Sequence, residues 1–115
     1  MNAESFRDYC LALPHCTELL PFDEVTLCFK INHTKIFAIL PLDTPTKVNL
    51  KCDPIKAVEL RECFNAVEPG FHMNKKHWNT VSFNDDLSDE TLIELIDHSY
   101  ELVWNSLPNK MKSSL

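Results

Sequence analysis

Glycine is nearly absent from this chain, since Gly70 is the only one among its 115 residues. A glycine-rich phosphate-binding loop needs several glycines close together, so that class of nucleotide site is excluded. Long apolar runs are lacking as well, and no segment approaches the roughly 18 apolar residues of a membrane-spanning helix. The first residues show neither a basic segment nor an apolar run, so we expect no secretory signal.

The five cysteines form no Cys-x-x-Cys pair, and the five histidines form no His-x-x-x-His pair. Zinc sites use such close pairs, whereas Cys52 and Cys63 lie on either side of an expected helix. An odd number of cysteines without an export signal indicates free thiols in a reducing cytoplasm. No pattern indicates an activated nucleophile, so we predict no metal site, no cofactor and no enzymatic activity.

Acidic residues outnumber basic ones, and the formal net charge is -6. The imbalance is uneven, because residues 30–80 carry a net charge of +3 between acidic segments of -4 (residues 1–29) and -5 (residues 81–115). The overall charge disfavours binding of a polyanion by the whole surface, whereas the basic middle favours a local contact. The simpler interpretation is that both ends form helices with solvated acidic faces.

Hydrophobic periodicity predicts an α+β fold. Apolar positions three or four residues apart indicate helices, and alternation with a period of two indicates strands. The clearest helix start is Asp53-Pro54, because aspartate accepts from free backbone N–H groups and proline fits the first helical position. The expected order is a helix at 6–13, strands at 25–31, 35–40 and 47–52, a helix from 54, a strand at 77–83 and a helix from 89.

This α-β-β-β-α-β-α order predicts an antiparallel sheet with helices packed on one face. Residues 1–110 are expected to form a single domain, and residues 111–115 a frayed tail. Asn32-His33-Thr34 is predicted to be a tight reversal between two strands, since asparagine tolerates left-handed backbone angles. Gly70 is expected to supply an unusual backbone angle in the break after the second helix.

The alternation of side chains along a strand, here called strand parity, predicts a second set of residues that face away from the core. If Val81 and Phe83 face the core, then Trp78, Thr80 and Ser82 face the other side of the sheet. The same alternation places four polar side chains on that side, namely Lys30, Lys47, Asn49 and Lys51. Lysines neutralise phosphates and an aromatic ring stacks on a base, so this side suits a nucleic acid. The alternative is a covered Trp78 among lysines that only confer solubility.

The segment from Pro69 to Val81 concentrates basic and aromatic side chains in an otherwise acidic chain. It contains His72, Asn74, Lys75, Lys76, His77 and Trp78. We predict that the two lysines contact phosphates, that the tryptophan stacks on a base, and that the histidines and the asparagine shape the turn or form hydrogen bonds. Each histidine also has a simpler interpretation, which is a hydrogen bond to loop backbone.

This turn resembles the His-x-Asn-Lys-x-His-Trp-x-Thr-Val pattern of the MmcQ/YjbR family of small bacterial proteins. Further matches extend over nearly the whole chain in the family's order; they are Phe37-Ala38, Val48-x-Leu50-Lys51, Pro54, Leu60-Arg61 and Ser99-Tyr100. Asp23 and Thr34 depart from the family, because relatives often have glycine there. The resemblance implies a frataxin-like (CyaY-like) fold, also described as a double-wing motif, and a DNA-binding role, which is the label commonly given to the family.

We therefore predict a small, monomeric, cytoplasmic protein without catalytic activity that binds DNA weakly and in a salt-dependent manner, with no membrane contact. The alternative is a protein-interaction or regulatory module that docks a partner through its acidic helices or the open sheet face, without nucleic-acid contact. Two further hypotheses are iron handling by acidic residues such as Glu4 and Asp8, and a small-molecule pocket under the turn from His72 to Trp78.

Overall fold

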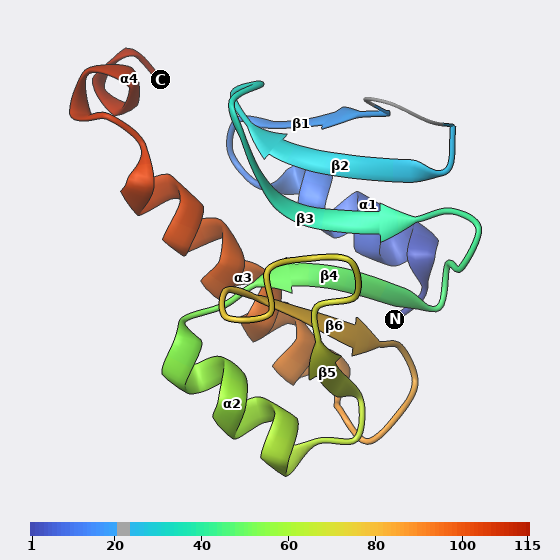
Figure 1. The fold of residues 1–115 in the computed structure, drawn as a ribbon. Helices are drawn as coiled ribbons and strands as arrows, with labels where there is room; N and C mark the ends of the chain where they lie inside the picture. Colours follow the sequence, from blue (N-terminus) through green and yellow to red (C-terminus); the bar gives the residue numbers. More distant parts are fainter. Residues whose placement is uncertain (21–23) are drawn as a thin grey trace.

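The computed structural model describes residues 1–20 and 24–115. In these residues the chain forms α1 (Ala3–Ala12), β1 (Cys16–Leu19), β2 (Thr26–Ile31), β3 (Lys35–Pro41), β4 (Lys47–Lys51), α2 (Pro54–Cys63), β5 (Val67–Pro69), β6 (Trp78–Ser82), α3 (Asp89–Ser106) and α4 (Asn109–Ser114). The strands make one antiparallel sheet in the order β1-β2-β3-β4-β6-β5 (Figure 1). Within the described part of the chain, no helix is long and apolar enough to cross a membrane.

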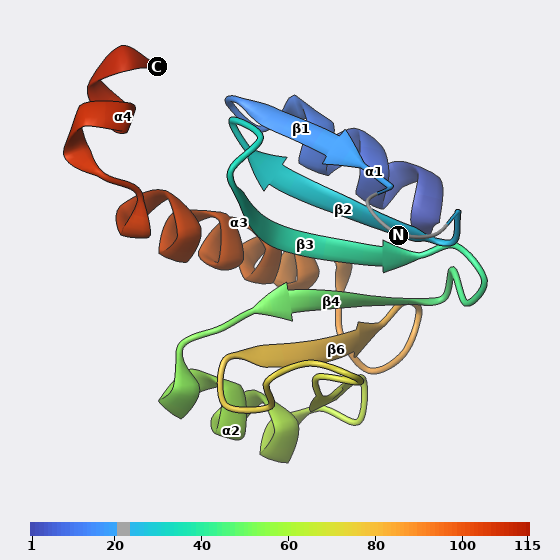
Figure 2. The same ribbon diagram turned by 45° about the horizontal axis from the view of Figure 1, so that its top comes forward.

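Two layers enclose the core. α1 and α3 lie against one face of the sheet, while α2 lies beside its β5–β6 end (Figure 1, Figure 2). Side chains without exposed surface come from both layers and include Phe6, Phe29, Phe37, Val48, Val81 and Ile96. Burial of such apolar side chains is the dominant favourable contribution to folding. The predicted α+β class, with an antiparallel sheet and helices on one face, is confirmed.

The start of α2 has the predicted cap. Asp53 Oδ2 accepts from the backbone N–H groups of Ile55 and Lys56, each at 3.1 Å. Pro54 occupies the first turn, where its missing N–H leaves no hydrogen bond unmade. The sequence signal and the structure therefore agree on where this helix begins.

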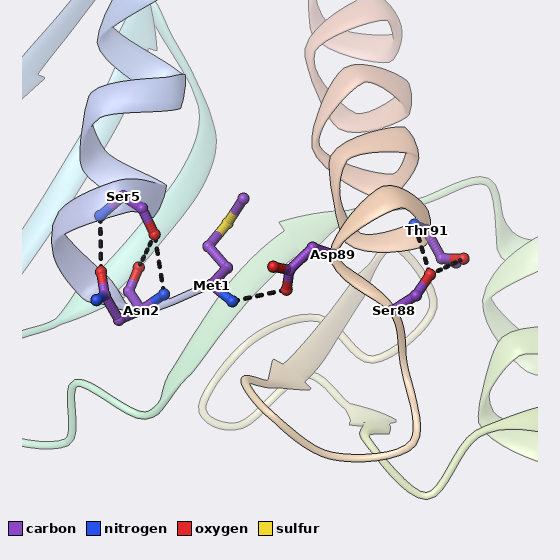
Figure 3. A network of polar contacts seen from close by, with 6 residues as sticks. All are labelled: Met1, Asn2, Ser5, Ser88, Asp89 and Thr91. Atoms are coloured by element: carbon purple, nitrogen blue, oxygen red, sulfur yellow. Dashed lines mark hydrogen bonds and ion pairs between the residues drawn. The ribbon is translucent and has the colours of Figure 1, made fainter.

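The start of α3 agrees with the helix predicted from residue 89, and it lies beside the start of the chain. Ser88 Oγ accepts from the backbone N–H of Thr91 at 3.1 Å. The Met1 ammonium donates to Asp89 Oδ1 at 2.6 Å, which joins the beginnings of α1 and α3 (Figure 3). Asp89 also lies in the first turn of α3, where a negative charge is favoured by the helix dipole.

The reversal between β2 and β3 is confirmed. Asn32 and His33 have φ angles of 48° and 58°, both in the left-handed region. Thr34, one of the two departures from the family pattern, closes the turn with a hydrogen bond from its Oγ1 to the carbonyl oxygen of Ile31 at 2.7 Å. Asp23, the other departure from the family pattern, lies outside the described residues.

Three elements lie where the sequence analysis predicted none. β1 and β5 are the edge strands of the sheet and contain four and three residues. Strands of three or four residues contain too few positions for an alternating pattern to be recognised in the sequence. They are defined by backbone pairing with one neighbouring strand, which the sequence does not show. Pro69 ends β5 at the edge, where a missing N–H is tolerated. α4 forms near the end of the chain, where periodicity indicated no helix.

Candidate nucleic-acid interface

The pairing of β4 with β6 shows which side chains share a face of the sheet. Val48 lies opposite Val81, and both are fully buried in the core. The pairs that alternate with it along the two strands are Lys47 with Ser82, Asn49 with Thr80, and Lys51 with Trp78. Since successive side chains of a strand point to opposite faces, these pairs lie on the face away from α1 and α3. The predicted strand parity is confirmed.

This face is not open along its whole length. Thr80 and Asn49 are only 5% and 8% exposed. Residues 70–77, here called the turn segment, pass over β4 and β6 on this face (Figure 1). Phe71 N donates to Thr80 Oγ1 at 2.9 Å, and Thr80 Oγ1 donates to Asn49 Oδ1 at 2.5 Å. The prediction of an exposed face is therefore wrong at these two positions, where a loop replaces solvent.

Gly70 begins the turn segment, and its role differs from the prediction. Its φ is not positive, whereas His72 has a φ of 59°. A Cβ on Gly70 would lie 2.8 Å from Trp78 Cβ and 2.9 Å from the Trp78 carbonyl oxygen. Both distances are shorter than van der Waals contact, and the N–H of Gly70 donates to that same oxygen at 2.9 Å. Gly70 is needed for a close backbone approach, so the predicted unusual angle is wrong.

Two predicted site residues stabilise the turn segment itself. Lys75 Nζ donates to the carbonyl oxygen of Gly70 at 2.9 Å. Asn74 Oδ1 accepts from the N–H of Lys76 at 2.9 Å, and its carbonyl oxygen accepts from the N–H of Trp78 at 3.0 Å. The Lys75 ammonium is thus engaged within the loop, whereas the exposed Lys76 side chain has no hydrogen bond or ion pair with any described residue.

Arg61 on α2 anchors the same segment and was not among the predicted site residues. Its Nε donates to Asn79 Oδ1 at 2.7 Å, and its Nη2 donates to the carbonyl oxygens of Lys75 and Trp78, the latter at 3.3 Å. The planar guanidinium suits several acceptors at once. The available sequence signal was Leu60-Arg61, one of the matches to the family pattern.

The two histidines of the turn segment have different surroundings. His72 is exposed, and its ring centroid lies 4.0 Å from that of Phe71, itself 68% exposed. His77 is half-buried, and its carbonyl oxygen accepts from the N–H of Cys52 at 2.8 Å. His72 therefore belongs to an exposed aromatic pair, whereas the backbone of His77 joins the turn segment to the end of β4.

The predicted lysines of the sheet do not form one cluster. Lys51 is the direct cross-strand neighbour of Trp78. Lys47 Nζ is 3.5 Å from Glu68 Oε2, so its charge has a partner. Lys30 lies on β2, two strand spacings from β4, which is roughly 10 Å. The structure thus brings Lys51 and Trp78 together and leaves Lys30 apart from them.

A pocket of ≈ 640 Å³ opens beside the turn segment on this face. Asn49 and Thr80 line it together with apolar and charged side chains, among them Ile39, Pro41, Phe71 and Met73, and Asp43, Lys47, Glu68 and His72. Its volume falls in the range of small-molecule sites. The sequence gives no signal for most of these residues, because the pocket is assembled from segments far apart in the chain.

Burial suppresses the reactivity of three of the cysteine thiols. All five cysteines are described and none forms a disulfide. Burial raises the pKa of the Cys10 and Cys52 thiols, and it raises the pKa of Cys16 to about 11. These three side chains are therefore protonated near neutral pH and are poor nucleophiles. Among the described residues, no three His, Cys, Asp or Glu side chains are grouped to hold a metal ion.

Solved structures of two bacterial proteins share this fold. The crystal structure of Deinococcus radiodurans protein DR2400, whose domain is described as DUF419, aligns with a TM-score of 0.88 and 33% sequence identity over 96% of this chain and 85% of that chain. A crystal structure of a Pseudomonas syringae protein aligns with a TM-score of 0.77 and 26% identity over 90% of this chain and 99% of that chain. Both alignments include nearly all of the present fold.

Two Escherichia coli proteins are similar to this chain over most of its sequence. The chain is 29% identical over 115 residues to Uncharacterized protein YjbR of Escherichia coli strain K12, covering 100% of this chain and 98% of that protein. It is 32% identical over 107 residues to Uncharacterized protein YbdF of Escherichia coli O157:H7, covering 93% of this chain and 88% of that protein. A family model described as YjbR matches residues 11–102. With the fold, the turn and these matches in agreement, this chain belongs to the YjbR family.

Proposed function

We propose that this chain is a non-enzymatic nucleic-acid-binding protein. Its contact surface is the face of the sheet away from α1 and α3, here called the helix-free face, together with the turn segment. The observation that carries the proposal is the cross-strand pair of Lys51 and Trp78 on that face. A lysine beside a partly exposed aromatic ring offers a phosphate contact and a stacking surface within one nucleotide's reach.

The distribution of charge supports this orientation. Much of the negative charge lies on α3, which carries Asp89, Glu90, Glu94, Asp97 and Glu101 and packs on the opposite face of the sheet. Among the described residues, Lys30, Lys51 and Lys76 have no ion-pair partner. A nucleic acid that approaches the helix-free face therefore meets unpaired lysines before it meets the acids of α3.

The contacts of the other lysines set the expected strength of binding. Lys75 is engaged with Gly70 and Lys47 with Glu68, which leaves Lys30, Lys51 and Lys76 for phosphates. Three contacts predict a slope of about -2 for the logarithm of the binding constant against the logarithm of salt concentration on a single strand. Binding is expected to be weak and easily lost as salt is raised.

The test is fluorescence anisotropy of a labelled single strand and a labelled duplex across a range of salt. The double variant Lys51→Gln, Lys76→Gln should lower the affinity at least tenfold and reduce the magnitude of the slope by about 1.4. The matched control is Lys110→Gln, Lys112→Gln, which removes the same charge from α4. Equal losses in the two variants would show a net-charge effect and would contradict this contact surface.

A protein-interaction module is the second candidate, and one feature of α2 favours it. Ile55 and Val58 are 74% and 49% exposed and lie three residues apart, so they share one side of the helix. Exposed apolar side chains on a common face are typical of docking surfaces. Absence of nucleic-acid binding by the wild-type chain even at low salt would favour this second candidate over the first.

A further inference from the structure

The pocket beside the turn segment has an unpaired donor in its wall. Asn49 is more than nine-tenths buried and lines the pocket. Its Oδ1 accepts from Thr80 Oγ1 at 2.5 Å, a separation that fits an O–H···O bond and is too short for N–H···O. The amide nitrogen Nδ2 therefore points away from Thr80, and it has no acceptor among the described residues.

The direction in which Asn49 Nδ2 points follows from a comparison with the fully buried polar atoms. In the described residues, no fully buried side-chain nitrogen or oxygen lacks a hydrogen-bond partner. Asn49 Nδ2 has no protein partner, so it must reach accessible space, and the space that Asn49 borders is the pocket. A nearly buried amide with two free N–H groups is costly unless a bound molecule or water accepts from it.

The surroundings of Asn49 indicate the kind of molecule. Ile39, Pro41, Phe71 and Met73 provide apolar walls, and Phe71 is 68% exposed. An exposed ring of this size gains contact area when a flat molecule stacks on it. The charged side chains at the pocket carry both signs, and Lys47 is paired with Glu68, so a strongly charged group is not selected at this point.

We propose that this pocket binds a flat heteroaromatic ring of the nucleobase type. A ring carbonyl oxygen or ring nitrogen accepts from Asn49 Nδ2, and the face of the ring packs against Phe71. The inference deepens the proposed function and rests on it for the source of the ring, which is an unpaired base of a single strand. A free nucleoside has the same chemistry, so the experiment separates the two sources.

The experiment uses the full chain with three probes: a labelled single strand of ten thymidines, the duplex of the same sequence, and free thymidine. Anisotropy measures both nucleic acids, and amide NMR shifts of Asn49, Phe71 and Thr80 report thymidine. Asn49→Ala and Phe71→Ala should each weaken single-strand binding about fivefold or more. Leu42→Ala, which removes an exposed apolar side chain outside the pocket, should bind like the wild type. Circular dichroism verifies that each variant is folded.

The outcomes separate this inference from the proposed function. Single-strand binding that exceeds duplex binding and falls in both pocket variants supports both. If the strand binds and responds to Lys51→Gln, Lys76→Gln but not to Asn49→Ala or Phe71→Ala, the pocket inference is overturned and the proposed function stands. If thymidine shifts the three amides but no strand binds, the ring site stands and the nucleic-acid function is overturned. If no probe binds, both are overturned.

Discussion

At Gly70 the backbone of the turn segment passes so close to Trp78 that no side chain fits between them. A Cβ there would approach Trp78 Cβ to 2.8 Å and the Trp78 carbonyl oxygen to 2.9 Å. Trp78 is the first residue of β6, where it pairs with Lys51, and neither its Cβ nor its carbonyl oxygen can be moved aside by a side-chain rotation, so the clash cannot be relieved in that way. The turn segment can therefore pack over β6 only because Gly70 has no Cβ atom.

The first residue-scale prediction concerns Gly70→Ala. Alanine would gain about 0.4–1 kcal/mol by restricting the unfolded chain, but the overpacking should cost about 1–3 kcal/mol. We expect a net loss of stability, measured as the free energy of unfolding in urea. Lys76→Ala, in the same segment with an exposed side chain, is the control and should be nearly neutral. An alanine variant as stable as the wild type would disprove the close approach.

Adjacent lysines of the turn segment show how position changes the role of one residue type. Lys75 Nζ is 2.9 Å from the Gly70 carbonyl oxygen, whereas Lys76 extends into solvent. The simultaneous replacement of both would combine a loss of loop structure with a loss of charge. A test of phosphate contact is therefore sharper with Lys51 and Lys76, whose side chains have no partner among the described residues.

At the scale of elements, α2 determines the shape of the turn segment through one side chain. Arg61 reaches Asn79 on β6 and the carbonyl oxygens of Lys75 and Trp78. Asn79 Nδ2 in turn donates to the carbonyl oxygen of Ala57 on α2 at 3.4 Å. The helix, the strand and the turn segment are thus joined by one polar network in which each buried group has a partner.

The element-scale prediction is that Arg61→Lys loosens the turn segment although the charge is kept. A lysine cannot reach the three acceptors with the geometry of a guanidinium, so we expect a loss of about 1–3 kcal/mol in the free energy of unfolding. Hydrogen exchange at the amides of Gly70 and Trp78 should become faster, because both pair within this segment. Glu62→Gln, on the exposed side of the same helix, is the control. Unchanged exchange would show that Arg61 does not anchor the segment.

At the scale of the whole molecule, α2 and α3 meet through a histidine. His98 Nε2 accepts from the N–H of Asp53 at 3.1 Å, and this bond joins α3 to the start of α2. Burial and the positive charge of Lys56 lower the pKa of His98 below 6.5, against the opposing effect of Asp53 and Glu101. Protonation of Nε2 would also remove the acceptor from this hydrogen bond.

This arrangement predicts how stability depends on pH. Because the pKa of His98 is lower in the folded state, the unfolded chain binds the proton more readily. Its contribution is therefore fully present above about pH 6.5 and is lost as the pH falls through the lower folded value. His98→Gln keeps an acceptor without a titrating group, so it should lose less stability between about pH 7.5 and 5.5. Urea unfolding at several pH values measures this, and parallel profiles would refute it.

The fold determines how the charge that varies along the sequence is distributed over the two sides of the sheet. Along the sequence, a basic middle lies between two acidic ends. In the fold, the acids of α3 and the lysines of β2 and β4 lie on opposite sides of the sheet. A cytoplasmic location and a monomeric state remain predictions.

Local interactions let the sequence determine the helix starts at Asp53 and Ser88, the alternation of β2 and β4, and the face on which Lys51 and Trp78 lie. Capping and periodicity act between residues a few positions apart, so they can be read along the chain. The cover over Asn49 and Thr80 and the pocket beside it were decided only by the tertiary structure. They depend on contacts between β4, β6, α2 and the turn segment, which lie far apart in the sequence and leave no periodic signal.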